Sequence, residues 1–150
     1  MSKILVAIDG SEPAWKALDL AIEIARNRQA GLLILHVIPY EPIAEGLRAF
    51  ATVEHVPYEE EEALFHYARS LGDNLTRDAE KSARRAGLTA VEGRTAEGRP
   101  ADQILALAAA EQVDMIVLGS RGRSDARALF LGSVSHQVTN QATCTCVTVK

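Results

Sequence analysis

Long apolar runs, excess positive charge and cysteine are all scarce in this sequence, and each shortage weighs against a class of function. No apolar run approaches the roughly 20 residues needed to cross a bilayer, so we expect no membrane partner. Lys and Arg number 16 against 20 Asp and Glu, and a net charge of -4 weighs against nucleic acid as a partner. The N-terminal residues lead directly into strand-like sequence with no signal-peptide pattern, so we expect a cytoplasmic protein.

The two cysteines, Cys144 and Cys146, lie two residues apart near the C-terminus. In a strand their side chains would share one face. No histidine has zinc-site spacing to this pair. We therefore expect two buried thiols, and a redox or metal role is the alternative.

Short apolar runs alternate with longer segments of helical periodicity. Runs at residues 3–8, 32–38, 89–94, 115–118 and 144–149 predict strands, several of them near-continuously apolar as buried parallel strands are. Helical spacing predicts helices from Ser11 to about residue 25, over 64–83, over 100–108 and over 132–140. This order predicts an α/β fold, a parallel sheet with helices on both faces. At 150 residues we expect a single domain over 1–150.

Residues 39–57 interrupt the alternation. Prolines at positions 39, 42 and 57 and a glycine at position 46 punctuate this segment, so we expect an excursion after the second strand. Connections of this length are uncommon and often functional.

The most informative motif is Gly119-Ser-Arg-Gly122, followed by Gly132-Ser133. Its first glycines end an apolar strand, where a missing Cβ lets the backbone approach a ligand. A helix that begins near Gly132-Ser133 would direct free N–H groups and the positive end of its dipole at an anion. Together these features predict a phosphate cradle.

A carboxylate, Asp9, follows the first expected strand. Ligands of open α/β sheets bind beyond the carboxyl ends of strands, where the strand order switches direction. If strands 3–8 and 115–118 are neighbours, Asp9 faces the phosphate cradle and could bond a ribose or help hold a phosphate-bound Mg²⁺. The alternative is that Asp9 only supports the turn into the next helix. Beside the glycine motif we favour the ligand role.

The motif differs from better-known phosphate loops. No lysine precedes Ser133, as G-x-x-x-x-G-K-[ST] requires, and the spacing is not G-x-G-x-x-G. Binding would rest on backbone N–H groups, hydroxyls and the helix dipole, which suits holding a nucleotide better than cleaving it. Arg121 could approach phosphates, whereas we expect Arg123 to be solvated. We expect His36 to be structural, and no nucleophile-elbow arrangement is visible.

These segments resemble the universal stress protein family, and more narrowly its ATP-binding branch. The resemblance rests on Ile4–Ser11, Leu35-His-Val37, the G-x2-G-x9-G-[ST] pattern and the closing strand, and it covers essentially the whole chain. It implies a Rossmann-like, adenine-nucleotide α-hydrolase-like fold with an open five-stranded parallel sheet in the order 3-2-1-4-5. It also implies ATP or AMP as ligand, with or without Mg²⁺, and a homodimer formed through the last strand around Val147 and Val149.

The resemblance further implies a set of nucleotide-binding residues and no catalytic ones. These are Ala7, Ile8, Asp9 and Val37 at the ribose and adenine, Leu118, Gly119, Arg121 and Gly122 in the phosphate loop, and Gly132, Ser133, Val134 and Ser135 at the helix start. The family's frequent proline-cysteine-proline stretch reads Thr143-Cys-Thr145 here, so pairing at the dimer edge is expected to differ locally.

We therefore predict an adenine-nucleotide-binding stress-response regulatory protein that acts as a homodimer. One alternative is an ATP-hydrolysing enzyme of the adenine-nucleotide α-hydrolase-like class, which the loop sequence Asp9-Gly-Ser-Glu12 disfavours. The other is a nucleotide-independent dimeric interaction module, which the retained motif glycines disfavour. Slow ATP hydrolysis is compatible with the first prediction.

Overall fold

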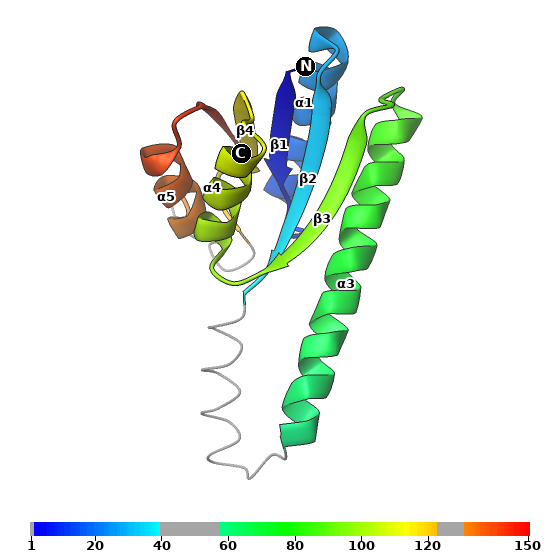
Figure 1. The fold of residues 1–150 in the computed structure, drawn as a ribbon, viewed down its shortest axis with the longest axis vertical. Helices are drawn as coiled ribbons and strands as arrows, with labels where there is room; N and C mark the ends of the chain where they lie inside the picture. Colours follow the sequence, from blue (N-terminus) through cyan, green and yellow to red (C-terminus); the bar gives the residue numbers. More distant parts are fainter. Residues whose placement is uncertain (1, 40–57, 123–130) are drawn as a thin grey trace.

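The computed structural model describes residues 2–39, 58–122 and 131–150. It contains a parallel sheet of five strands in the order β3-β2-β1-β4-β5, which confirms the predicted order. Figure 1 shows β3, β2, β1 and β4 of this sheet side by side. The strands are β1 (Lys3–Ala7), β2 (Gly31–Ile38), β3 (Val91–Glu97), β4 (Met115–Gly119) and β5 (Thr145–Val149). The helices of the described ranges are α1 (Glu12–Arg28), α3 (Tyr58–Arg85), α4 (Pro100–Ala110) and α5 (Ser133–Gln141).

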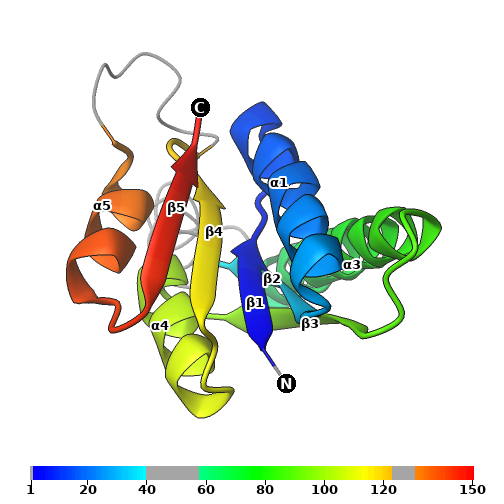
Figure 2. The ribbon, with the colours of Figure 1, turned by 90° about the horizontal axis from the view of Figure 1, so that it is seen from above.

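Helices cover both faces of the sheet (Figure 2). Along β1, Ile4 and Val6 pack into a core formed with α1 and α3, whereas Leu5 packs into a core formed with α4 and α5. This alternation is the two-residue period of a strand. Because both faces are buried, the central strands need apolar side chains at nearly every position, which explains their continuous apolar runs.

The helix starts follow local capping rules. Ser11 caps α1, and its hydroxyl accepts a hydrogen bond from the N–H of Ala14 at 3.3 Å. At the other end, Gln29 adopts a left-handed conformation with φ 52° and closes the helix. Pro100 opens α4, as the sequence predicts.

The boundaries of β3 differ from the predicted ones at both ends. The sequence predicts this strand at 89–94, but it runs over Val91–Glu97. Its second half is Thr95-Ala-Glu97, which has no apolar pattern, because β3 lies at an edge of the sheet and only part of its surface is buried. The helix predicted from apolar positions over 64–83 starts earlier, at Tyr58, so that the acidic run Glu59–Glu62 lies in the first turn of α3, where negative charge is favourable.

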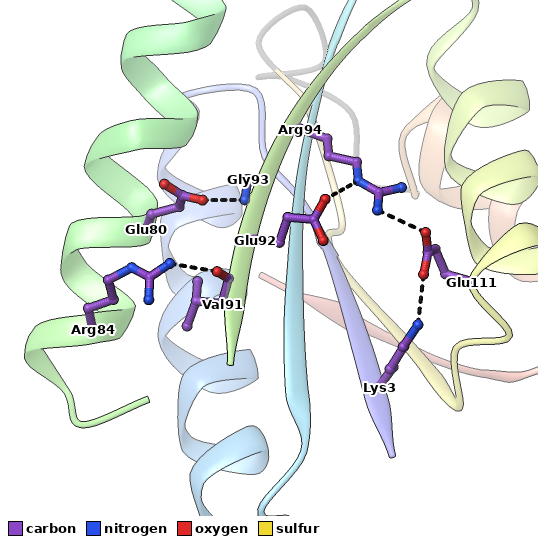
Figure 3. Close-up of polar contacts among 8 residues, drawn as sticks. All are labelled: Lys3, Glu80, Arg84, Val91, Glu92, Gly93, Arg94 and Glu111. Carbon is purple, nitrogen blue, oxygen red and sulfur yellow. Dashed lines mark hydrogen bonds and ion pairs between the residues drawn. The ribbon is translucent and has the colours of Figure 1, made fainter. Parts of the chain in front are cut away.

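A charged cluster joins the amino-terminal ends of β1 and β3 to the end of α4 (Figure 3). Glu111 pairs with the ammonium of Lys3 at 2.7 Å and with the guanidinium of Arg94 at 2.8 Å. Arg94 also pairs with Glu92 at 2.6 Å. The hydrogen bond from Lys3, which has the larger effect, and the hydrogen bond from Arg94 both lower the pKa of the Glu111 carboxyl.

Both cysteines pack against the α4 and α5 side of the sheet, which confirms that they share one face. They are partly rather than fully buried. Burial raises the pKa of both thiols.

The excursion after β2 and the absence of a membrane span are two further predictions from the sequence. The excursion predicted at 39–57 lies, apart from Pro39, outside the described residues. In the described ranges, no helix has the combination of length and apolar character that crossing a bilayer requires.

Candidate functional site

A pocket of about 610 Å³ lies at the carboxyl ends of β1, β2 and β4. This volume is within the roughly 300–1,000 Å³ that is usual for small-molecule sites. All twelve residues that the sequence assigned to a nucleotide site line it. They are Ala7, Ile8, Asp9, Val37, Leu118, Gly119, Arg121, Gly122, Gly132, Ser133, Val134 and Ser135. The structure thus brings these residues together, and their contact with a ligand stays a prediction.

Asp9 lies at the switch point of the sheet, because β1 pairs with β2 on one side and with β4 on the other. Its Oδ1 atom accepts a hydrogen bond from the N–H of Ser11 at 2.9 Å, so it does support the turn into α1. Its Oδ2 atom lies 3.0 Å from the position that a Cβ on Gly122 would occupy. The carboxylate therefore supports the turn with one oxygen and faces the glycine loop with the other.

The two glycines of the first motif have different local surroundings. A Cβ on Gly119 would lie 3.0 Å from the backbone nitrogen of Ala14 and 3.0 Å from atoms of Pro13. The missing side chain at Gly119 is therefore explained by the close packing of α1 on β4, without any ligand. Only at Gly122 does the missing side chain leave space beside Asp9 within the pocket.

The amino-terminal turn of α5 forms another wall of the pocket. Gly132 is the N-cap and provides no side-chain cap, and the first helical hydrogen bond runs from His136 N–H to Gly132 C=O at 2.9 Å. The N–H groups of Ser133, Val134 and Ser135 precede that bond, so the helix itself leaves them without a partner. Because all three residues line the pocket, this turn offers hydrogen-bond donors and the positive helix end to an anion.

The hydroxyl of Ser135 is hydrogen-bonded within the protein. It is buried and donates to the carbonyls of Ser120 and Gly132, both at 2.9 Å. It therefore holds the end of β4 against the start of α5. At this position the backbone N–H group, and not the hydroxyl, is available to a ligand.

His36 lines the pocket but is held by the fold. Its Nδ1 atom donates to the carbonyl of Ile8 at 2.9 Å, which ties β2 to the residue before Asp9. The ring also packs against α3, where a Cβ on Gly72 would lie only 2.6 Å from the His36 Cδ2 atom. These contacts agree with the predicted structural role of this histidine.

Charge in the pocket comes from few side chains. Among the residues described, Asp9 is the only carboxylate that lines it, and Arg121 is the only Lys or Arg. No group of three or more His, Cys, Asp or Glu residues suited to a metal ion occurs in the described ranges. A Mg²⁺ ion at this site would therefore have Asp9 and ligand oxygens available to it. Arg123 lies outside the described residues.

Two helices supply pocket walls that sequence reasoning did not assign to the site. Ala68 and Leu71 come from α3, and Pro100 and Ile104 come from α4. Helical periodicity marks Ala68, Leu71 and Ile104 as members of apolar helix faces, but it does not separate a residue that faces the core from one that faces a cavity. Leu71 shows the difference, because the residue is 51% exposed while it lines the pocket.

The model of the universal stress protein family matches residues 1–150. The chain belongs to the universal stress protein family. The universal stress protein YxiE of Bacillus subtilis is 36% identical over 149 residues, which cover 99% of each chain.

Two solved structures are similar to this chain over nearly its whole length. The hypothetical protein MJ0577 is 28% identical and has a TM-score of 0.82, with 99% of this chain and 95% of that chain covered. A universal stress protein solved in complex with cAMP is 25% identical and has a TM-score of 0.66, again with 99% and 95% covered. The fold of this universal stress protein family member is thus shared along almost its whole length.

Proposed function

We propose that this member of the universal stress protein family binds an adenine nucleotide in the pocket and acts as a regulatory homodimer in a stress response. One observation carries the proposal. Asp9, Gly122 and the uncapped start of α5 meet in one pocket at the switch point of the sheet. A relative solved in complex with cAMP supports the same ligand class.

The surroundings of each part of the pocket suit a different part of a nucleotide. The N–H groups of Ser133 and Val134 would bond the phosphates, and Arg121 would offset their charge. Asp9 Oδ2 would accept a hydrogen bond from a ribose hydroxyl or contact a phosphate-bound Mg²⁺. The base would lie against the apolar wall near Val37.

Binding is favoured over hydrolysis by the charges that line the pocket. Phosphoryl-transfer sites combine cationic groups, metal ions and a residue that orients the nucleophile. In the described part of the pocket, Arg121 is the only cationic lysine or arginine, and no lysine accompanies the glycine motif. Slow ATP hydrolysis is compatible with this arrangement, whereas rapid turnover is not expected.

The proposed homodimer would form through β5. This strand is at an edge of the sheet, and Val147 and Val149 pack against the core on the α1 side. A second copy would continue the sheet from this edge, with Thr143 and Thr145 keeping backbone N–H groups that prolines would lack. A cytoplasmic location is part of the same proposal.

The deciding experiment is mass spectrometry of nucleotide released from the purified, denatured protein. Calorimetric titrations with ATP, ADP, AMP and cAMP then rank the ligands. We expect Gly122→Val and Gly132→Val to abolish binding and to leave the mass of the dimer unchanged, because each side chain would enter the space next to the phosphates. The absence of both co-purified nucleotide and millimolar or better affinity would refute the proposal.

A matched control separates loss of the site from a general effect of replacing glycine. Gly31 lies at the start of β2, and a Cβ there would have its nearest neighbours at 3.9 Å. Gly31→Ala should therefore retain the nucleotide affinity of the wild-type protein.

A further inference from the structure

The edge strands β3 and β5 differ in whether side chains hydrogen-bond to their outward backbone groups. Leu32 N–H donates to Ala90 C=O at 2.9 Å, and Gly98 N–H donates to Ile38 C=O at 3.0 Å. The even-numbered residues of β3 therefore direct their backbone groups towards β2. Because the direction alternates along a strand, Val91 and Gly93 direct their backbone N–H and C=O groups outwards, away from β2. Unpaired outward groups of this kind can pair with a strand of another chain.

Two side chains of α3 form hydrogen bonds with these outward backbone groups (Figure 3). The Glu80 carboxylate accepts a hydrogen bond from Gly93 N–H at 2.5 Å. The Arg84 guanidinium donates to Val91 C=O at 2.7 Å and to Thr89 C=O at 3.3 Å. Gly93 makes room for this contact, since a Cβ there would lie 3.1 Å from atoms of the Glu80 side chain.

The pattern of these bonds matches that of an added parallel strand. In a parallel ladder, one residue of the incoming strand donates its N–H to one carbonyl and accepts from the N–H two residues further along. Val91 C=O and Gly93 N–H are such a pair. Glu80 and Arg84 lie four residues apart on one helix face, and they supply the acceptor and the donor that the incoming residue would provide.

The two side chains also occupy the space that another strand would need. Neighbouring strands lie about 4.8 Å apart, so an added strand would have to displace both Glu80 and Arg84 from β3. Further along the same edge, Arg69 of α3 pairs with Glu97 at the end of β3 at 2.6 Å. Polar contacts from α3 thus reach both halves of this strand.

The other edge lacks such a cover in the described part of the chain. Ser120 N–H donates to Val149 C=O at 2.7 Å, so Val149 faces β4 and its neighbour Thr148 directs its backbone groups outwards. Among the described residues, no side chain of another element hydrogen-bonds to the backbone of Cys146 or Thr148.

We propose that Glu80 and Arg84 close the β3 edge to strand addition, so that a second copy of this chain extends the sheet only at β5. The closure of β3 depends on the observed contacts alone. The use of β5 rests on the proposed homodimer.

The test removes both side chains. We expect the double variant Glu80→Ala with Arg84→Ala to form species larger than the wild-type protein, with a mass that rises with concentration in size-exclusion chromatography with light scattering. The control variant Asp73→Ala with Arg77→Ala also loses opposite charges four residues apart on α3, and it should keep the wild-type mass. Glu80→Gln retains an acceptor oxygen and should also keep it.

Hydrogen exchange reports on the edge contact itself. The Gly93 amide should exchange severalfold faster in Glu80→Ala than in the wild-type protein, while amides of the central strands stay protected. This readout applies even if the variant is less stable, because the protected core amides report global unfolding in the same experiment.

A third variant distinguishes failure of this inference from failure of the proposed homodimer. Thr148→Pro removes an outward N–H at β5 and leaves the ladder with β4 in place, so it should yield a monomer. Adding Glu80→Ala and Arg84→Ala to it should restore association, now through β3. A wild-type monomer would refute the homodimer and leave the β3 test intact. A double variant with the wild-type mass at every concentration and unchanged Gly93 exchange would overturn the inference, as would equal association of the Asp73 and Arg77 control.

Discussion

Replacing each glycine of the first motif by alanine should separate a packing role from a ligand-binding role. A Cβ on Gly119 would lie 3.0 Å from the backbone of Pro13 and Ala14, well inside the usual carbon contact distance of about 3.5–4.0 Å. The first turn of α1 must then move away from β4. Overpacking of this kind costs about 1–3 kcal/mol, and at this chain length each kcal/mol lowers Tm by about 2–4 °C. We therefore expect Gly119→Ala to lower Tm by about 2–12 °C.

Gly122→Ala should have the opposite effects, with little change in stability and a loss of nucleotide affinity. Its Cβ would meet Asp9 Oδ2 at 3.0 Å, but in the described ranges only Oδ1 of this carboxylate has a hydrogen bond, to Ser11. The free Oδ2 can therefore shift while Oδ1 stays bonded to Ser11, at a cost within about 0.5 kcal/mol, and Tm should change by less than about 2 °C. Nucleotide affinity should fall by about tenfold or more, since the ligand loses a charge-assisted contact.

Thermal unfolding followed by circular dichroism and calorimetric titration with ATP measure the two effects in the same samples. Gly31→Ala serves as the control for both, because its Cβ has no neighbour closer than 3.9 Å. A wild-type Tm for Gly119→Ala would refute the packing explanation of that glycine. Wild-type affinity for Gly122→Ala would show that no ligand occupies the space beside Asp9.

Three further predictions concern other contacts. Gly72→Ala should lower Tm, because its Cβ would lie 2.6 Å from His36 Cδ2 and must push α3 away from β2, and thermal melts measure this. Glu111 has its pKa lowered in the folded protein by two cationic partners, so its stabilising effect is complete above the ordinary value of 4.5 and is lost as pH falls through the folded value. Thermal melts from about pH 5 to about pH 3 should therefore show a smaller loss of stability for Glu111→Gln than for wild type, and equal slopes would refute this. Burial raises the pKa of Cys144 and Cys146, so iodoacetamide at neutral pH should alkylate them more slowly than a free thiol, as mass spectrometry can follow; equal rates would contradict it.

The sequence predicts the fold well where both faces of an element are buried. Residues 3–8, 32–38 and 115–118 are apolar at nearly every position, because the central parallel strands contact helices on both sides. The same reasoning is weaker at β3, whose second half is polar because the strand lies at an edge. There the strand is formed by its ladder with β2 and by contacts from α3, which no local pattern encodes.

The sequence likewise predicts one part of the candidate site and misses another. The spacing of the glycines and the position of Asp9 identified residues that the structure brings into one pocket. The pocket walls from α3 and α4 were not identified, since Leu71 and Ile104 have the same periodicity as core residues. Whether an apolar residue faces a core or a cavity depends on what packs opposite to it.

By itself, the sequence determined the alternation of strands and helices, the helix cap at Ser11, the start of α4 at Pro100, and the set of residues at the strand ends. These features depend on local periodicity and on backbone preferences, which neighbouring residues encode. Only the tertiary structure decided that Gly119 serves the packing of α1, that Gly122 faces Asp9, and that side chains of α3 cover the β3 edge. These depend on distances between segments far apart in the chain, and they are set by how the helices pack on the sheet.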